Sequence, residues 1–286
     1  MATDDSTTNF VPSGFHLVER LGVGTVFAVA RVADAQGREL ICKRAADPRF
    51  AGALERERDL LTILCGAAVP ELVASGRDAR GGFLVETRAR GEPLRELMTE
   101  GQALPPATTW IALARASAHA LATLHAFRDD IGPLGFVHGD ISPDNLFFEP
   151  PTTVTFIDFS SASFRDMPDP PHLGDRGTVP YAAPELLRQE TRATPECDTY
   201  ALAATLLAAA VGLPIVRATT EAARLYEAAS QGVLWTRIDE RADLPFDLRS
   251  ALSEALQYEQ ARRLVSSREL AARLGPLSSP APHRHE

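Results

Sequence analysis

The stretch of residues 136–163, FVHGDISPDNLFFEPPTTVTFIDFSSAS, constrains what this chain can fold into more than any other part of it. It contains two short apolar runs, Asn145–Phe148 and Val154–Phe159, with a Pro-Pro pair between them. Short apolar runs bounded by proline-rich turns are typical of paired strands. The stretch therefore predicts a strand–turn–strand element in the middle of the chain.

Three polar side chains lie at the edges of the two predicted strands, namely Asp140, Asn145 and Asp158. Two carboxylates and an amide are hard-oxygen donors. They suit Mg²⁺ because this ion binds through a few carboxylates, waters and substrate phosphates. The sequence therefore predicts a magnesium site here, and the alternative is an acidic β-hairpin without chemistry.

Composition limits the architecture and the partners. The chain has 286 residues, of which 45% are hydrophobic and 23% charged, enough for one large two-lobed domain or two small ones. The formal net charge is −9. This balance argues against nucleic acid and against an anionic membrane surface as partners, because those contacts are built from Lys and Arg.

Cysteine spacing and the N-terminal sequence favour a cytoplasmic location. Cys42, Cys65 and Cys197 lie far apart without CxxC spacing, so neither a disulfide framework nor a zinc site is expected. The first ten residues, MATDDSTTNF, contain no apolar signal region. The apolar run 200–216 is broken by glycine and proline, which favours a buried core helix over a membrane span.

The motifs within 136–163 resemble those of the protein kinase superfamily. His138-Gly139-Asp140 followed by Asn145 is similar to the catalytic loop H-R-D-x-x-x-x-N, and Asp158-Phe159-Ser160 is similar to D-F-G. The resemblance implies an α+β, two-lobed fold, with a small antiparallel β-sheet lobe carrying one helix and a larger, mainly helical lobe. The implied kinase-like domain is 13–275, divided into an N-lobe 13–86, a hinge 87–94 and a C-lobe 95–275, with disordered segments at 1–12 and 276–286.

The predicted N-lobe resembles the superfamily's nucleotide-binding motifs. Phe15–Val32 alternates apolar and polar residues on both sides of two glycines, which predicts a hairpin with the glycines in the turn. This hairpin and the strand that ends at Ile41-Cys42-Lys43 resemble G-x-G-x-x-G-x-V and V-A-I-K. By that resemblance the ATP-binding residues are Leu21, Gly22, Gly24, Val29, Ile41 and Lys43.

An amphipathic helix is predicted over Phe50–Leu64, and it offers Glu55 and Glu57 as partners for Lys43. The position of Glu57 before the helix leucines resembles the superfamily's E-x-x-x-L register. Glu57 is therefore the residue expected to hold Lys43 on the α- and β-phosphates of ATP. In the strand before the hinge, the register leaves open whether Val85 or Glu86 lines the back of the pocket.

Three further motifs lie in the predicted C-lobe. Gly177–Glu185, GTVPYAAPE, resembles the segment G-T-x-x-Y-x-A-P-E, which shapes the site for a protein substrate and places Thr178 on the substrate side. Asp198 matches the buried aspartate that braces the catalytic loop. Arg263 matches the arginine that pairs with the A-P-E glutamate, so Arg263 and Glu185 are expected to form a buried bidentate pair.

The resemblance implies an ATP- and Mg²⁺-dependent kinase that transfers the γ-phosphate to a Ser or Thr hydroxyl. Asp140 would accept a proton from the substrate hydroxyl or orient it, Asn145 and Asp158 would hold Mg²⁺, and Lys43 would grip ATP. The expected partner is a protein, either a substrate or a regulator. The sequence favours no particular oligomeric state.

Four positions depart from the superfamily's pattern: Phe27 replaces the third loop glycine, Gly139 the Arg of H-R-D, Ser142 a Lys near the γ-phosphate, and Ser160 the Gly of D-F-G. They leave two alternatives open, a pseudokinase that binds nucleotide or a partner without transfer, and a small-molecule kinase. The missing Arg, together with the lack of Ser, Thr or Tyr from 164 to 177, predicts that activation-loop phosphorylation does not switch this kinase on.

Overall fold

The structure is a computed structural model. It describes residues 10–24, 26–66, 68–98, 104–167, 177–213, 215–263 and 266–277. The chain divides into two compact units, 1–89 and 90–286. The boundary falls within 87–94, the segment that the sequence predicts as a hinge.

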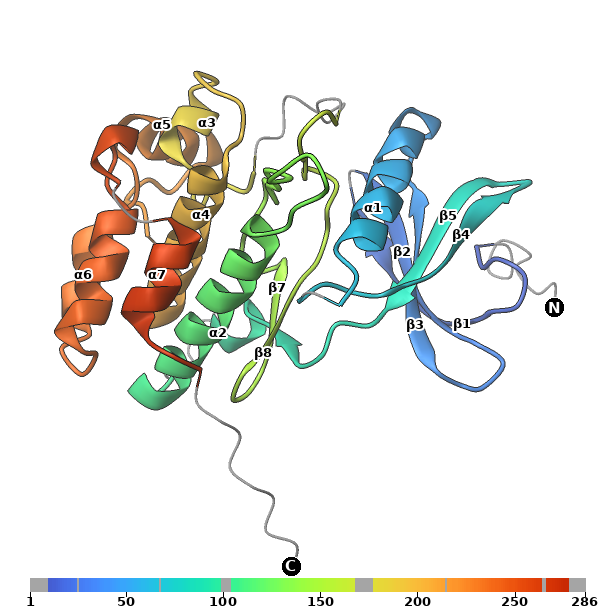
Figure 1. The fold of residues 1–286 in the computed structure, drawn as a ribbon, viewed down its shortest axis with the longest axis horizontal. Coiled ribbons are helices and arrows are strands. Elements are labelled where there is room, and N and C mark those ends of the chain that lie inside the picture. The colour runs from blue at the N-terminus through green and yellow to red at the C-terminus, as the bar shows by residue number, and fades with distance from the viewer. Residues whose placement is uncertain are drawn as a thin grey trace, which may run out of the picture. The chain divides into compact units, whose positions relative to one another are not determined.

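The first unit is built on five antiparallel strands in the order β1-β2-β3-β5-β4 (Figure 1). The strands are β1 His16–Val23, β2 Phe27–Ala33, β3 Glu39–Ala45, β4 Leu72–Asp78 and β5 Gly81–Thr87. The predicted hairpin is β1 and β2, and the backbone N–H of Gly24 closes its turn by donating to the Phe27 carbonyl at 2.8 Å. Gly22 still belongs to β1, so only one of the two glycines lies in the turn.

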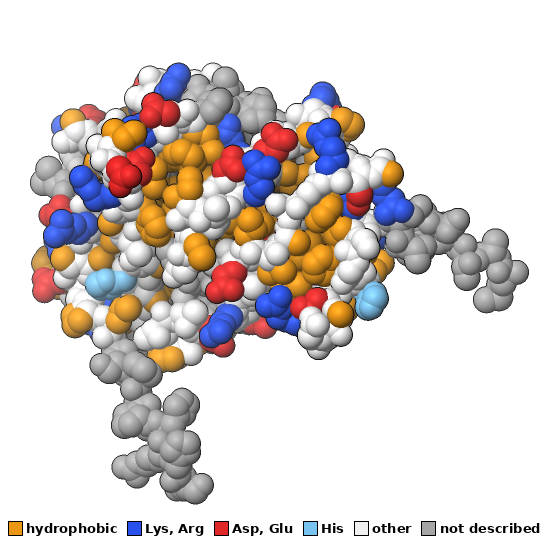
Figure 2. All heavy atoms as spheres, turned by 45° about the vertical axis from the view of Figure 1, so that its right-hand side comes forward, with side chains coloured by type: hydrophobic (Ala, Val, Ile, Leu, Met, Phe, Trp, Pro, Cys, Tyr) orange, Lys and Arg blue, Asp and Glu red, His pale blue; other side chains and the backbone are white. Residues whose placement is uncertain are grey.

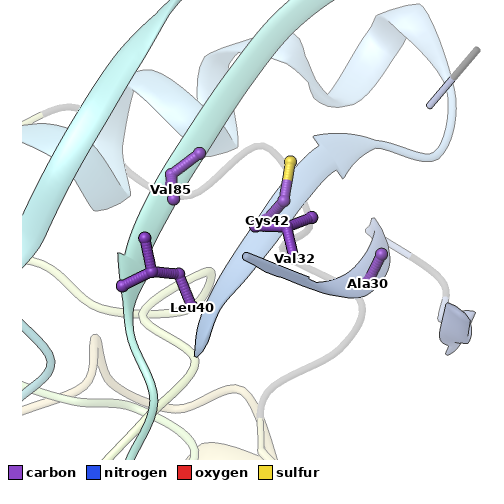
Figure 3. Close-up of a cluster of buried hydrophobic side chains, with 5 residues drawn as sticks. All are labelled: Ala30, Val32, Leu40, Cys42 and Val85. Atoms are coloured by element: carbon purple, nitrogen blue, oxygen red, sulfur yellow. The ribbon is translucent and has the colours of Figure 1, made fainter. Parts of the chain in front are cut away.

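One face of this sheet carries a buried apolar cluster of Ala30, Val32, Leu40, Cys42 and Val85 (Figure 3). Alternate residues of a strand point to opposite faces, so the intervening residues of β2, β3 and β5 face the other way. The apolar cluster and the predicted nucleotide-binding side chains therefore occupy opposite faces of one sheet.

The N-terminal segment corrects one prediction. The sequence predicts disorder over 1–12, but Phe10 and Val11 pack against the apolar cluster. The guanidinium of Arg44 donates to the backbone carbonyl of Phe10 at 2.6 Å and stacks near the Phe10 ring. Residues 10–12 are ordered because they cover apolar surface that the sheet alone leaves open to water. Residues 1–9 lie outside the described residues.

Helix α1, Ala51–Ile63, follows a short 3₁₀ helix at Pro48–Phe50 and packs against β3, β4 and β5. It confirms the predicted amphipathic helix over 50–64. Leu54, Leu60 and Leu61 are buried on its inner face, as the sequence spacing requires, and the charged side chain of Glu57 is buried with them.

The second unit is mainly helical (Figure 1). Its helices are α2 Ala107–His125, α3 Pro184–Leu187, α4 Pro195–Val211, α5 Glu221–Gln231, α6 Phe246–Ala255 and α7 Ser267–Leu274, with short 3₁₀ helices at Glu96–Met98, Trp235–Glu240 and Gln260–Arg262. Helix α4 is the predicted core helix, buried from Cys197 to Val211. It ends earlier than the predicted run because Gly212 takes a left-handed backbone with φ of 74°.

A small three-stranded sheet, β6-β7-β8, contains the two strands of the stretch 136–163. The strands are β6 Glu92–Pro93, β7 Leu146–Glu149 and β8 Thr153–Phe156. The predicted pair of strands is present, but the second ends at Phe156 and not at Phe159. The chain leaves the sheet there because Asp158 has a left-handed backbone, φ 62°, which is incompatible with a strand.

The α+β architecture predicted from the sequence, a small sheet unit with one helix and a larger helical unit, is confirmed. Across the described residues, we find no helix that is both long and apolar enough to cross a membrane. On the face drawn in Figure 2, Lys and Arg side chains are interspersed with Asp and Glu side chains and do not gather in one basic field.

Candidate active site

In the first unit, the ammonium of Lys43 is held between two carboxylates. Its Nζ atom lies 2.6 Å from Oε1 of Glu57 on α1 and 2.9 Å from Oε1 of Glu86 on β5. All three side chains are buried. The predicted Lys43–Glu57 pair is therefore present as a charge-assisted hydrogen bond, and the Lys43–Glu86 contact is an ion pair.

Glu86 is the contact that sequence reasoning missed. In the β3–β5 ladder, Val85 pairs with Cys42 and joins the apolar cluster, whereas Glu86 pairs with Ile41 and faces the side of Lys43. The open question of register is thereby resolved in favour of Glu86. The sequence did contain one sign of this contact. An acidic residue, Glu86, directly follows the apolar run Phe83–Val85, and the alternation of side chains along a strand does not by itself explain an acidic residue there.

The other predicted nucleotide-binding residues lie around Lys43 on the same sheet. Val29 pairs with Lys43 in the β2–β3 ladder, Gly22 pairs with Val29, and Ile41 lies two residues before Lys43 on the same face. Leu21 is half exposed on β1. Phe27, which replaces the third loop glycine, is buried with its ring centroid 5.8 Å from the Lys43 ammonium, within cation–π range.

In the second unit, three groups converge on the carboxylate of Asp140. The backbone N–H and the hydroxyl of Thr178 both donate to Oδ1 at 2.8 Å. The amide nitrogen of Asn145 donates to Oδ2 at 3.1 Å and to the Asp140 carbonyl at 2.9 Å. Burial raises the pKa of Asp140, and the Thr178 hydroxyl opposes that shift because it hydrogen-bonds the ionised form.

Asp198 braces the loop that presents Asp140, as the sequence predicts. Its carboxylate accepts hydrogen bonds from the backbone N–H groups of His138, at 2.6 Å, and Gly139, at 2.9 Å. The ring of His125 lies 3.1 Å from the same carboxylate. One buried carboxylate thus binds two main-chain N–H groups, and these hydrogen bonds fix the backbone conformation immediately before Asp140.

The segment around Asp158 is fixed by packing and by its own backbone. Phe159 is fully buried, with its ring centroid 5.0 Å from that of His138 and 6.3 Å from that of Phe136. The backbone N–H of Ser160 donates to Asp158 Oδ1 at 3.2 Å. Ser160 itself is not in the left-handed region, so the Gly-to-Ser departure at this position imposes no backbone strain.

The oxygen donors of this loop fit a hard divalent cation. Asn145 uses its amide nitrogen on Asp140, so its amide oxygen remains as an acceptor. The Ser142 hydroxyl is buried and finds no hydrogen-bond partner among the described residues, which leaves it for a bound ligand or water. No cluster of three or more His, Cys, Asp or Glu suited to a metal occurs in the described ranges.

Gly139 is required by the local geometry. Its φ is +80°, and a Cβ atom at this position would lie 2.6 Å from the backbone oxygen of Ser161. Real Cβ atoms do not approach a backbone carbonyl so closely, and the left-handed backbone disfavours a side chain in any case. The loop therefore requires glycine where H-R-D has arginine, because an arginine side chain at position 139 would displace the segment that follows Phe159.

The predicted ion pair between Glu185 and Arg263 is present and bidentate. The two guanidinium nitrogens lie 2.5 and 2.9 Å from the two carboxylate oxygens, and both side chains are buried. The same guanidinium donates to the carbonyls of Gln257 and Tyr258, and it stacks 4.4 Å from the Tyr200 ring centroid. This pair ties the start of α3 to the segment before α7.

Comparison with known proteins agrees with this geometry. The family model "Protein kinase domain" matches residues 15–272 of the chain. The chain belongs to the protein kinase family. The contacts described above form two groups, Lys43 with Glu57 in the first unit and Asp140 with Asn145 and Thr178 in the second.

Bacterial serine/threonine kinases are among the similar proteins. The serine/threonine-protein kinase AfsK of Streptomyces griseus is 25% identical over 270 residues, covering 92% of this chain and 31% of its own length. The AfsK protein of Streptomyces coelicolor is 24% identical with similar coverage. The serine/threonine-protein kinase PknL of Mycobacterium tuberculosis is 28% identical over 159 residues, which are 55% of this chain and 38% of PknL. The chain thus spans well under half the length of these relatives.

Proposed function

We propose that this chain is an ATP- and Mg²⁺-dependent protein kinase that transfers the γ-phosphate to a Ser or Thr hydroxyl. The observation that carries the proposal is the carboxylate of Asp140, held by Thr178 on one oxygen and by Asn145 on the other. A carboxylate fixed in this way can accept a proton from a substrate hydroxyl or orient it.

In this proposal each of the predicted site residues has one role. Lys43, positioned by Glu57, binds the α- and β-phosphates, and Gly22 and Gly24 lie over them. Asn145 and Asp158 hold Mg²⁺, which neutralises charge that develops on the transferred phosphoryl group. No residue forms a covalent intermediate, because phosphoryl transfer asks the protein mainly for positioning and charge neutralisation.

A protein substrate is supported by three features of the second unit. The segment Gly177–Glu185 places Thr178 on Asp140, and the Glu185–Arg263 pair anchors the end of that segment. Asp198 accepts hydrogen bonds from the backbone of the loop that precedes Asp140 and so holds that loop in place. Similar bacterial proteins carry the name serine/threonine-protein kinase, which agrees with Ser or Thr as the acceptor.

A pseudokinase is the second candidate, favoured by two observations. Lys43 already contacts two carboxylates, and Ser142 replaces a Lys that would lie near the γ-phosphate, so positive charge for the phosphates is reduced at both positions. Such a chain could bind nucleotide or a partner without transfer.

The test is a radiolabelled-ATP assay with Mg²⁺, using a generic protein acceptor and a panel of small alcohols and sugars. We expect transfer to protein, with a loss on the order of a thousandfold in Asp158→Asn because a metal carboxylate is removed. Asp166→Asn is the matched control, since Asp166 has the same left-handed backbone, φ 64°, and an exposed side chain. Nucleotide-induced thermal stabilisation without transfer would support the pseudokinase, and transfer to small acceptors alone would support a small-molecule kinase.

We further propose that activation-loop phosphorylation does not switch this kinase on. The stretch 164–177 contains no hydroxyl side chain, and Gly139 stands where an arginine would bind the phosphate. Phosphoproteomic mapping of the active enzyme should find this segment unmodified, and a phosphate on Thr178 that raises activity would contradict the proposal.

A further inference from the structure

In the second unit, the loop 126–136 joins helix α2 to the catalytic loop and is held together by its own hydrogen bonds. The carboxylate of Asp129 accepts from the backbone N–H groups of Ile131, at 2.9 Å, and Gly132, at 3.0 Å. Near the other end of the loop, the side chain of Leu134 is buried. The loop is therefore a fixed support for the chain that contacts it.

Arg165 contacts this loop through three separate groups. Its backbone N–H donates to the Leu134 carbonyl at 2.7 Å, and its Nη1 atom donates to the Pro133 carbonyl at 2.7 Å. Its Nη2 atom lies 2.6 and 2.5 Å from the two carboxylate oxygens of Asp129. An isolated, partly exposed ion pair contributes little to stability, but this pair is one of three contacts between the same residue and the same loop.

The segment 158–165 connects Arg165 to Asp158 and is paired along its length. Two backbone hydrogen bonds, at 2.8 and 2.9 Å, join Ser163 to Val137. Phe159, the residue next to Asp158, is fully buried. The position of Asp158 therefore depends on a short segment whose far end is fixed by Arg165.

From these contacts we infer that Arg165 is a positioning residue, which fixes the segment 158–165 to the loop 126–136 and so holds Asp158 in place without a phosphate. The inference rests on the proposed function and adds the means by which this segment is ordered. Phosphorylation orders a loop by placing a new anion opposite an arginine. Here the carboxylate of Asp129 already pairs with the arginine, so the anchor needs no modification.

The first test is amide hydrogen exchange of the full chain, which needs neither nucleotide nor acceptor. Arg165→Met removes the guanidinium, and exchange at the amides of positions 163 and 165 should become about tenfold faster. Asp129→Asn keeps an oxygen for the turn and for Arg165 but removes the charge, so exchange should rise less, on the order of threefold. The double variant should exchange as Arg165→Met does, because the two side chains act through one pair.

Two matched variants serve as controls for the exchange experiment. Arg128→Met removes an exposed arginine of the same loop, whose backbone pairs with Pro133. Asp166→Asn removes a largely exposed carboxylate 3.5 Å from the Nε atom of Arg165. Both variants should leave exchange at positions 163 and 165 at the wild-type rate.

The second test is the Mg²⁺ dependence of phosphoryl transfer. In the proposed function Asp158 holds the metal, so its displacement in Arg165→Met should raise the Mg²⁺ concentration for half-maximal transfer about tenfold. The KM for the protein acceptor should stay close to the wild-type value. A role of Arg165 in stability alone would lower the melting temperature and leave the Mg²⁺ dependence unchanged.

The two tests separate failure of the inference from failure of the proposed function. Unchanged exchange at positions 163 and 165 in Arg165→Met overturns the inference, whatever the rate of transfer. Faster exchange with an unchanged Mg²⁺ dependence overturns the positioning of Asp158. A wild type that transfers no phosphate overturns the proposed function, whereas the exchange experiment still decides whether Arg165 fixes the segment 158–165.

Discussion

The backbone N–H and the side-chain hydroxyl of Thr178 both donate to the same oxygen of Asp140, each at 2.8 Å. One residue of the segment 177–185 thus engages the proposed catalytic carboxylate twice. The other carboxylate oxygen accepts from Asn145 at 3.1 Å, so the orientation of the whole group is set within the second unit. The hydrogen bonds to Asp140 can therefore be tested by substitution of Thr178.

Removal of the Thr178 hydroxyl should move the pH dependence of transfer. Burial raises the pKa of Asp140, and the Thr178 hydroxyl lowers it by stabilising the ionised form. In Thr178→Ala that opposing effect is lost and the pKa rises further. The proposed function requires the carboxylate form, so activity is lost as the pH falls through this pKa, and the acid limb of kcat/KM should shift to higher pH.

Thr178→Ser keeps the hydroxyl and should keep the wild-type acid limb. An acid limb that stays in place in Thr178→Ala, or shifts to lower pH, would be inconsistent with the hydrogen bond acting on Asp140.

Breaking the buried Glu185–Arg263 pair should destabilise the second unit. Arg263→Met leaves a buried carboxylate unpaired, which costs about 3–5 kcal/mol of unfolding free energy. The double variant Glu185→Leu/Arg263→Met removes both charges and should be considerably more stable than Arg263→Met alone. Urea unfolding followed by tryptophan fluorescence reports on this unit, because Trp110 and Trp235 both lie in it. Equal stability of the single and double variants would show that the pair is not coupled.

A side chain at position 139 should not be tolerated. Gly139→Ala introduces a Cβ atom 2.6 Å from the Ser161 carbonyl oxygen in a left-handed backbone, which should cost about 2–4 kcal/mol. Gly135 is the matched control, with φ of +60° and nothing within 4 Å of an added Cβ. Gly135→Ala should therefore cost only about 1 kcal/mol. The measurement is the urea midpoint of both variants, and similar values for the two would refute the close approach to Ser161.

Neutralising Asp198 should loosen the catalytic loop. In Asp198→Ala two backbone N–H groups, those of His138 and Gly139, lose their acceptor, at a cost of about 2–4 kcal/mol. We expect faster amide hydrogen exchange at these two positions and a fall in kcat that exceeds any change in KM. Unchanged exchange at both amides would exclude the bracing role.

The sequence by itself determined the elements and the chemistry of the individual motifs. The hairpin of β1 and β2 and the helix α1 follow from apolar periodicity, and the core helix α4 follows from a continuous apolar run, both of which are local properties of the chain. Lys43, Asp140 and Asn145 could be selected because each lies at a fixed spacing from a neighbouring motif residue.

Only the tertiary structure decided three features that neither periodicity nor the motif resemblance predicted. The contact between Lys43 and Glu86 depends on β5 pairing next to β3, a strand order that no local pattern encodes. The ordering of Phe10 depends on apolar surface left open by the sheet, and the need for glycine at 139 depends on the backbone of Ser161. These contacts join residues far apart in sequence or depend on three-dimensional packing. Periodicity constrains which face a side chain occupies, whereas its partner is selected by the packing of the whole unit.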